Sequence, residues 1–478
     1  MLSFIETFQF ILPEVILLVF ALAILVCSLL MRSKGLLGAL ALTAVVLASL
    51  FLPRVNTTHA SLFFNMLTDD AFSTFFKVIC LFITGVIILI SMGYKTLQSG
   101  HIGEYYFLLL SATIAMLLAV SSNNLIMIYI SLEMLSLASY ILVGFFKHDD
   151  LSSEGALKYF IFGALSTGIM LYGISLIYGV FGTMDLSAIA NTLKTAPTNA
   201  LISSVLLLFI LAGLSFKCAL VPFHMWAPDA YQGAPTSISA FISVGPKAVG
   251  FAVLLRIFTR NFLPLYADCV TIIMLVSVFT MTIGNIIAIS QTNIKRMLAY
   301  SSIAQAGYIL IGFVVGTASG TEGALYYIFA YTLMNLGAFG CIVLISNSIR
   351  SDNIEDYAGL SKKDPVSAFM LAVFLLSLAG IPPLAGFFGK FMVFAAAIGS
   401  KFIFLAVAGA LNSVIAVYYY VKVIKYMYLD EPKATEMKKN PAPLQIALII
   451  IMIGVLIAGI YPSPFLNWIR LSQVFFLQ

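Results

Sequence analysis

Long uncharged apolar runs constrain the fold of this chain more than any other feature. Residues 444–461 contain no charged side chain, and several further runs reach the roughly 18 to 20 residues with which a helix crosses a bilayer. Only 9% of the 478 residues are charged, against about 25% in soluble domains. The runs are continuous, whereas the strands of a membrane barrel alternate between polar and apolar residues. The sequence therefore predicts an all-α polytopic membrane protein that has lipid as its main solvent.

The apolar runs predict fourteen membrane spans with short connections, and thus a single membrane domain over residues 1–478. The first run has no basic segment before it and no small-residue cleavage signal after it, so we interpret it as a retained span and not as a signal peptide. The predicted spans cover residues 11–31, 35–52, 71–93, 104–120, 124–146, 156–181, 200–221, 235–258, 268–289, 295–315, 322–346, 366–398, 402–428 and 443–461. The tail, with Trp468 and Arg470, is expected at headgroup depth.

The basic residues of the loops predict the orientation of the chain. Cytoplasmic loops carry an excess of Lys and Arg. This excess lies on the side opposite the N-terminus, with residues such as Arg32, Lys34, Lys362, Lys363, Lys438 and Lys439. Fewer lie on the N-terminal side, namely Arg54, Lys194, Arg256, Arg260, Lys401 and Arg470. Both termini are therefore expected on the outer, periplasmic side of a bacterial inner membrane.

The sequence offers no motif for a redox cofactor, a metal ion or a nucleotide. The five cysteines lie far apart and form no CxxC pair, so iron–sulfur and zinc spacings are missing. Neither a GxGxxG nor a GxxxxGK[ST] stretch is present. The net charge of +5 is spread over short loops and does not indicate a nucleic-acid partner. We expect no cofactor and no metal in this chain, and any electron transfer in another chain.

Five lysines fall inside the predicted spans, where an ionisable group costs about 2.5–3.5 kcal/mol and typically marks a transport path. They are Lys77, Lys158, Lys217, Lys247 and Lys390. Lys77 lies about two turns into its span, so its ammonium group can also extend back to the interface. Lys158 follows Glu154 by four residues. Because this spacing stabilises a helix by itself, a local role and a functional role both stay open for that pair.

Three of these lysines lie close to prolines that are expected to break helices. Lys217, Lys247 and Lys390 occur in the stretches SFKCALVPF, SVGPKAVGF and LAGIPPLAGFFGKF. Proline interrupts the helix, and the carbonyls that it frees need water or polar partners at membrane depth. Broken helices are a known way to build ion sites in transporters, so these lysines are predicted to carry protons.

Glu133 is the only acid predicted to lie deep in a span. Tyr129, Ser136 and Tyr140 share its helix face, which indicates a wet, inward-facing stripe. An isolated carboxylate there would be protonated, so we expect a lysine partner. At about 4 Å and an effective dielectric constant near 20, the attraction is about 4 kcal/mol, or roughly three pKa units. Moving such a pair apart would release a proton.

Other polar residues allow two interpretations each. His224, in PFHMW, either relays protons near neutral pH or is an interfacial loop residue. In later spans, Ser301, Gln305, Tyr308 and Asn335 either hold water chains or pack helices together.

Two stretches that begin with LAG suggest an internal repeat. LAGLSFKCALVPF belongs to the seventh predicted span and LAGIPPLAGFFGKF to the twelfth. An odd separation of five spans reverses the direction of the chain, so the two stretches would be related by an inverted repeat. Such repeats place a transport site near the bilayer midplane.

Four motifs together resemble the antiporter-like subunits of respiratory Complex I, a family shared with Mrp-type cation/proton antiporters and membrane-bound hydrogenases. They are SLEMLSLASYILVGF with Glu133, FKCALVPFHMWAPDAYQGAPTSISAF with Lys217, NIKRMLAYSSIAQAGY with Lys295, and SLAGIPPLAGFFGKF with Lys390. The resemblance covers nearly the whole chain. Lys247 after Gly-Pro, the lysine in the twelfth span and the lack of a long lateral helix are typical of the N-type branch.

The resemblance implies a proton-translocating subunit with two inverted five-helix repeats, spans four to eight and nine to thirteen, in which helices seven and twelve are broken. The sections would be residues 1–100, 101–260, 261–430 and 431–478. Glu133 would modulate Lys217, Lys247 would act as the central relay and Lys390 would face the exit half-channel. Lys295, which the span count puts at a cytoplasmic boundary, would join the buried path.

The same resemblance implies partners and leaves rivals open. Flavin, iron–sulfur clusters and quinone would belong to partner subunits, and antiporter-like M-type and K/L-type subunits would be neighbours in the membrane. An Mrp-type Na⁺/H⁺ antiporter subunit and a ferredoxin-dependent photosynthetic relative of Complex I stay open as alternatives. A scaffold without pumping is disfavoured, because a mere spacer would gain stability by losing its buried charges.

Overall fold

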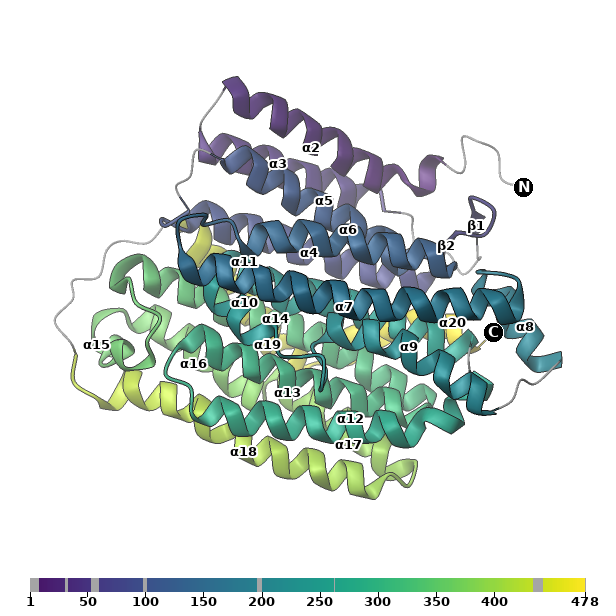
Figure 1. The fold of residues 1–478 in the computed structure, drawn as a ribbon. Coiled ribbons are helices and arrows are strands. Elements are labelled where there is room, and N and C mark those ends of the chain that lie inside the picture. Colours follow the sequence, from purple (N-terminus) through teal and green to yellow (C-terminus); the bar gives the residue numbers. More distant parts are fainter. Residues whose placement is uncertain are drawn as a thin grey trace.

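The computed structural model describes residues 8–30, 33–52, 60–97, 101–195, 200–261, 263–432 and 442–477. These residues form a bundle of helices that run side by side, with α2 (Leu12–Leu30) and α3 (Lys34–Leu50) at one edge and α18 (Ile403–Leu429) at the opposite edge (Figure 1). Within these ranges, ten helices are long and apolar enough to cross a membrane, or eleven if one bent pair counts as a span. The prediction of an all-α polytopic membrane protein is confirmed.

The element bounds follow the predicted spans closely. The first half contains the strands β1 (Ala60–Leu62) and β2 (Leu67–Asp69) and the helices α4 (Ala71–Gly93), α5 (Ile102–Ser121), α6 (Leu125–Val143), α7 (Asp150–Phe181), α8 (Leu186–Thr195), α9 (Ala200–Cys218), α10 (Ala227–Gly233) and α11 (Thr236–Leu255), which continues as the π-helix η1 (Arg256–Asn261). The second half contains α12 (Leu263–Ile289), α13 (Ile294–Val315), α14 (Ala318–Ile349), the 3₁₀-helix η2 (Ile354–Tyr357), α15 (Leu360–Lys363), α16 (Pro365–Ala379), α17 (Ala385–Gly399), α19 (Ala442–Ile460) and α20 (Ser463–Leu477).

Each predicted span contains a helix, but four apolar helices are shorter than a full span: α3, α9, α16 and α17. The count of fourteen spans therefore stays a prediction. The antiparallel hairpin β1–β2 was not expected from the sequence. The tail forms α20, which is bent from α19 by 81°. Trp468 of α20 packs on Phe75 near the start of α4, with ring centroids 4.6 Å apart, so the tail is part of the packed bundle.

Polar caps fix the starts of the helices that matter most for the site. Asp70 caps α4, since its carboxylate accepts the Ser73 N–H while the Ser73 side chain bonds back to the Asp70 N–H. This reciprocal capping box satisfies two backbone donors that a helix start leaves free. Asn293 caps α13 in a similar way by accepting the Arg296 N–H.

Two spans are broken, and both breaks begin with the same type of helix end. After α9, Ala219 adopts a left-handed conformation, with φ of 54°, and the Leu220 N–H donates back to Ser215 at 2.8 Å. After α16, Gly380 has φ of 89° and the Ile381 N–H donates back to Leu376 at 3.1 Å. These are Schellman-type ends, and the prolines that follow cannot continue the helix. The predicted breaks in spans seven and twelve are thus present.

The two LAG triplets, in contrast, do not occupy equivalent positions. Gly213 lies inside α9, whereas Gly380 forms the left-handed end of α16. Lys217 precedes its break and Lys390 follows its own break in α17. The two stretches therefore share a broken helix. Their matching LAG triplets lie at different positions relative to the breaks.

The predicted break next to Lys247 is wrong, because α11 continues through Pro246. Proline removes the N–H that would bond to the carbonyl four residues earlier. That carbonyl, of Ile242, lies 3.5 Å from the Tyr231 hydroxyl, which is its polar partner. Every residue of α11 is buried, so its neighbours hold it in helical form on all sides.

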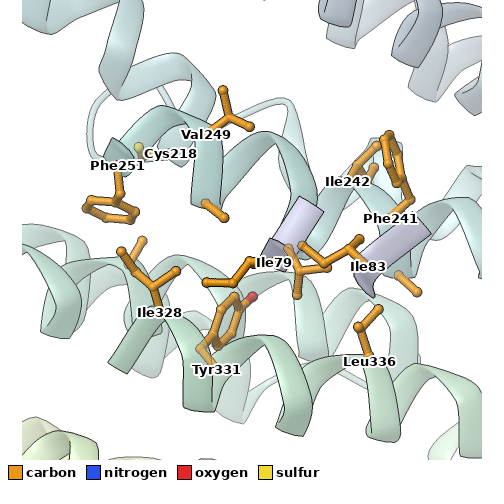
Figure 2. Close-up of a cluster of buried hydrophobic side chains, with 14 of the residues drawn as sticks. Ile79, Ile83, Cys218, Phe241, Ile242, Val249, Phe251, Ile328, Tyr331 and Leu336 are labelled. Carbon is orange, nitrogen blue, oxygen red and sulfur yellow. The ribbon is translucent and has the colours of Figure 1, made fainter. Parts of the chain in front are cut away.

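The core of the bundle forms where α4, α11 and α14 meet. Figure 2 shows Ile79 and Ile83 of α4 in one apolar cluster with Phe241 of α11 and with Tyr331 and Leu336 of α14. Outer helices keep an apolar exposed face, as on α18, which is the surface that lipid or a neighbouring membrane protein can cover. The central helices therefore place their polar residues away from both water and lipid.

Candidate functional site: a row of buried lysines

Lys217 ends α9 just before the first break, with its ammonium group directed at α6. The group donates to the Leu132 carbonyl at 3.2 Å and to the Ser136 hydroxyl. Ser136 was predicted to lie on the wet face of its helix, and its contact with Lys217 agrees with that prediction. Trp226 donates to the Phe216 carbonyl at 3.2 Å, so the break is also stabilised from the downstream side.

Glu133 lies between the two residues that hold Lys217, but it does not pair with that lysine. Its carboxylate is half-buried, and Oε1 has no hydrogen-bond partner. The expected direct ion pair is wrong for this structure, since the ion pairs of the described residues include neither Glu133 nor Lys217. Glu133 is instead one residue from Leu132 and three residues from Ser136, the two contacts that Lys217 makes on α6.

Lys247 occupies the centre of α11 and points at α13. Its ammonium group donates to both the carbonyl, at 2.7 Å, and the hydroxyl, at 2.5 Å, of Ser302. The Tyr231 hydroxyl is also 3.1 Å from that Ser302 hydroxyl. Gly250, three residues further on, has room for no side chain, because an added Cβ would be 3.2 Å from the Cβ of Lys217. Helices α9 and α11 are therefore in close contact at their lysines.

Lys390 lies in α17, after the second break, and its ammonium group is held by the end of α16. It donates to the Ala379 carbonyl at 2.9 Å and to the Ser413 hydroxyl at 2.8 Å. The carbonyl ends of a helix favour a cation because the helix dipole is negative there. The nitrogen is also 4.6 Å from the ring centre of Tyr308, which adds a cation–π contact.

A chain of hydrogen bonds connects the surroundings of Lys247 to those of Lys390. Ser301, next to Ser302 on α13, bonds to the Tyr420 hydroxyl. Gln305 donates to that hydroxyl at 3.2 Å and to the Leu378 carbonyl at 2.9 Å. Lys390 donates to the same carbonyl at 3.3 Å. Ser301 and Gln305, which the sequence left open between water-holding and packing, thus lie on a polar track.

Lys217, Lys247 and Lys390, called the lysine row from here on, share one pattern of contacts. Each ammonium group donates to one serine hydroxyl and to backbone carbonyls, one carbonyl for Lys217 and for Lys247 and two for Lys390. None of the three has a carboxylate within ion-pair distance among the described residues. Neutral acceptors stabilise an ammonium group less than a carboxylate does. A hydroxyl can also donate to the neutral amine once the proton has left. The arrangement can therefore hold either protonation state of the lysine.

Lys158 and Glu154 belong to a partly exposed ion-pair cluster and not to this row. Lys158, with 39% of its side chain exposed, lies 2.5 Å from Glu154 and 2.7 Å from Asp229 of α10. Arg296 pairs with the same Asp229. Burial acts to raise the pKa of Asp229, but its hydrogen bonds from Lys158 and Arg296 outweigh burial and lower that pKa. The prediction that Lys158 is buried in a span is wrong, and the cluster ties α7, α10 and α13 together.

Lys295, next to Arg296, is buried at the start of α13. Its ammonium group donates to the Ala234 carbonyl at 2.9 Å and lies 3.6 Å from Asp352. Asp352 lines a polar cavity of about 590 Å³. Lys295 thus has a carboxylate partner at the rim of a cavity, which distinguishes it from the three lysines with neutral partners.

His224 lies in the break between α9 and α10. The residue is 2% exposed, and its Nδ1 has no hydrogen-bond partner. It is therefore a buried residue of the break and not an exposed one, and the interfacial interpretation stays a prediction. It contacts none of the lysines by a hydrogen bond within the part of the chain that the structure describes, and a relay role stays a prediction.

Two buried ion pairs near the start of α4 correct the sequence analysis. Lys77 does not extend to the interface but pairs with Glu14 of α2 at 2.8 Å, with side chains 4% and 7% exposed. Glu133 is therefore not the only acid buried within a helix. Arg256, counted above as a loop residue, is buried and donates to both oxygens of Asp70, at 2.9 and 3.1 Å. Arg256 therefore does not count among the basic loop residues of the N-terminal side. The difference in basic loop residues between the two sides, on which the predicted orientation depends, becomes larger.

Several site residues escaped the sequence analysis because nothing local marks them. Ser302, Ser413 and Asp229 are ordinary residues in helices until the fold brings a lysine to them. No group of His, Cys, Asp and Glu residues in the described ranges has the arrangement of a metal site.

Comparison with known proteins places the chain in a family. The family model of the NADH:quinone oxidoreductase/Mrp antiporter transmembrane region matches residues 122–416. The NADH-quinone oxidoreductase subunit N of Trichlorobacter lovleyi is 44% identical over 96% of this chain and 95% of that protein. The chloroplastic NAD(P)H-quinone oxidoreductase subunit 2 of Mesostigma viride is 40% identical over 96% and 94%.

A solved structure agrees with these sequence matches. A chain of respiratory complex I from Thermus thermophilus, determined with bound aureothin, superimposes with a TM-score of 0.81. It is 30% identical, and the match covers 95% of this chain and 98% of that chain. The matched family region contains Glu133 and the three lysines with neutral partners. The chain therefore belongs to the NADH:quinone oxidoreductase/Mrp antiporter transmembrane family.

Proposed function

We propose that the chain is the N-type proton-translocating subunit of an NADH:quinone oxidoreductase, with Lys217, Lys247 and Lys390 as its proton carriers. The observation that carries this proposal is their shared type of partners, a serine hydroxyl and backbone carbonyls for each lysine. Such partners hold a lysine in lipid without fixing its charge. The names of the relatives at 44% and 40% identity support the assignment to a quinone-reducing complex.

In this mechanism the proton moves from Lys217 to Lys247 and on to Lys390. The last step has a polar track at hand, from Ser302 and Ser301 over Gln305 to the carbonyl that Lys390 also contacts. Glu133 acts on Lys217 by charge alone: when it moves closer it favours the ammonium form, and when it moves away it favours proton release. Quinone reduction in partner subunits would drive that movement.

The finer architecture belongs to the same proposal. Counting α3, α9, the broken pair α16–α17 and α19 with the ten long helices supports fourteen spans, in two inverted five-helix repeats of spans four to eight and nine to thirteen. The corresponding sections are residues 1–100, 101–260, 261–430 and 431–478. We further propose a bacterial inner-membrane location with both termini outside, M-type and K/L-type neighbours, and flavin, iron–sulfur clusters and quinone in partner subunits. Lys295 would load the row, with Lys158, Glu154 and His224 in supporting roles.

The test is proton pumping by a Lys217→Ala variant in inverted membrane vesicles, with pumping expressed per NADH oxidised. We expect pumping to fall strongly while the complex stays assembled. Lys425→Ala is the matched control, because Lys425 is an exposed helical lysine that pairs with Asp430 at 3.4 Å. Undiminished pumping by the assembled Lys217 variant would refute the proposal.

A second candidate is a relative that takes electrons from another donor, since the match to the chloroplastic NAD(P)H-quinone oxidoreductase subunit is nearly as strong. An Mrp-type antiporter subunit is the third. Purification in mild detergent distinguishes them. A flavin-containing NADH-oxidising partner supports the proposal, a ferredoxin-binding partner supports the second candidate, and a set of membrane subunits without redox cofactors supports the third.

A further inference from the structure

A second group of buried charges lies apart from the lysine row, at the start of α2 and α4. This α2–α4 cluster consists of Glu14, Asp69, Asp70, Lys77 and Arg256. Glu14 is in the first turn of α2, Asp69 ends β2, Asp70 caps α4, and Arg256 continues α11. All five residues are buried. None of them was predicted to form a site.

The cluster contains more acids than bases. Arg256 closes one ion pair with Asp70, through two hydrogen bonds. Lys77 closes a second pair with Glu14. Asp69 remains, with 4% of its surface exposed and with Oδ1 buried without a hydrogen-bond partner. Glu14 also has one buried oxygen, Oε2, without a partner. If all five groups were charged, the cluster would carry one uncompensated negative charge.

A buried carboxylate without a partner is costly, and binding a proton removes that cost. Asp69 faces Lys77 and Asp70 from α4 and Glu14 from α2, while Arg256 from α11 is engaged by Asp70. Burial is the largest influence and raises the pKa of Asp69 to about 6; Lys77 opposes this shift, and Asp70 and Glu14 add to it. Asp69 lies in the hairpin, outside the helices that are long enough to span a membrane.

We propose that the α2–α4 cluster is a proton-binding site, in which Asp69 takes up one proton from water and the Glu14–Lys77 pair tunes its affinity. The carboxylate becomes a neutral carboxylic acid, no other bond changes, and the cluster becomes electrically neutral. The site does not depend on the lysine row as a proton carrier. It includes the Asp70–Arg256 pair, so its charge acts at the end of the helix that carries Lys247.

The test is pH-difference infrared spectroscopy on the complete complex in lipid nanodiscs, without turnover. Lowering the pH from about 8 to about 5 should produce a protonated-carboxyl C=O band in the wild type, because this range spans the titration of a shifted acid. The band should be missing in Asp69→Asn. Glu104→Gln is the matched control, since Glu104 is an exposed acid at the start of α5 paired with His101, and it should retain the band.

Two charge variants test the site further. Glu14→Gln removes a neighbouring negative charge and should lower the midpoint of the band, whereas Lys77→Met removes a positive charge and should raise it. These opposite shifts would not arise from a purely structural role. An unchanged band in Asp69→Asn overturns the proposal. If that variant fails to assemble, an unshifted midpoint in Glu14→Gln overturns it instead. Neither result bears on proton pumping by the lysine row, which is measured separately.

Discussion

Gly380 offers the sharpest test of how Lys390 is held. Its φ of 89° is left-handed, and a Cβ added there would lie 2.9 Å from Cδ and 3.2 Å from Nζ of Lys390. In Gly380→Ala the backbone strain costs about 1–2 kcal/mol, and the lysine must also move. Losing one hydrogen bond to a charged group costs about 1.5–3 kcal/mol. The population of the conformation in which the end of α16 binds Lys390 should therefore fall roughly tenfold to hundredfold. We expect pumping per NADH oxidised to fall by a factor in this range.

Gly182 provides a control with the same backbone requirement and no neighbour. Its φ is 67°, and an added Cβ would meet nothing within 4 Å. Gly182→Ala therefore costs similar strain without touching a lysine, and its pumping should stay near the wild-type value. Dye-based measurement of vesicle acidification, with NADH oxidation followed in parallel, gives the ratio for both variants. Equal pumping by the two variants would refute the idea that the position of Lys390 matters.

Three further predictions follow from other contacts. Arg256→Met leaves Asp70 buried without its cation, so the free energy of unfolding should fall by about 3–5 kcal/mol, and the denaturation temperature should fall with it. Arg256→Met with Asp70→Asn should recover much of the loss, because asparagine removes the charge and keeps an oxygen that can cap α4. Ser302→Ala removes one acceptor of the Lys247 ammonium group and should reduce pumping by about tenfold or more, for about 1.5–3 kcal/mol, while Ser302→Thr keeps the acceptor. Equal pumping by both variants would contradict this. The lowered pKa of Asp229 means that its ion pairs stabilise the protein above the unfolded pKa and lose their effect as the pH falls through the folded pKa. Wild-type denaturation temperature should therefore drop more than that of Asp229→Asn between about pH 5 and about pH 2.

The spans could be predicted because lipid imposes one simple requirement on the whole chain. A long apolar run predicts a helix in hydrocarbon, since a helix bonds every backbone group within the segment. The breaks after α9 and α16 could be predicted for a related reason, because proline removes a backbone N–H donor. The continuity of α11 could not be predicted, because its stability at Pro246 depends on neighbours such as Tyr231 from another element.

The partners of the buried charges could not be predicted, because they come from distant parts of the chain. Arg256 and Asp70 are 186 residues apart. Composition marks such a charge as costly but does not say whether the fold provides a counter-charge. Lys77 looked the least functional of the five lysines, yet it forms a fully buried pair. Lys158 looked buried, yet a partly exposed Asp229 holds it at the end of the bundle.

The neutral partners of the row lysines were equally hidden. A serine or a carbonyl has no signature in a helix that is rich in both. The sequence singled out these three lysines but did not reveal their surroundings, in which carbonyl and hydroxyl groups are the partners.

The contact between Lys390 and the end of α16 has a consequence for when water can enter. While the lysine is charged, it occupies the carbonyls of Leu378 and Ala379, which the broken helix leaves free. When the proton leaves, the neutral amine donates fewer and weaker bonds, and the Ala379 carbonyl loses its strongest donor, whereas the Leu378 carbonyl keeps Gln305. The most favourable replacement is a water molecule drawn into the break. Loss of the proton from Lys390 would thus favour entry of water at the break, and uptake of a proton would favour its exclusion. The same side chain would then carry the proton and control the access of water.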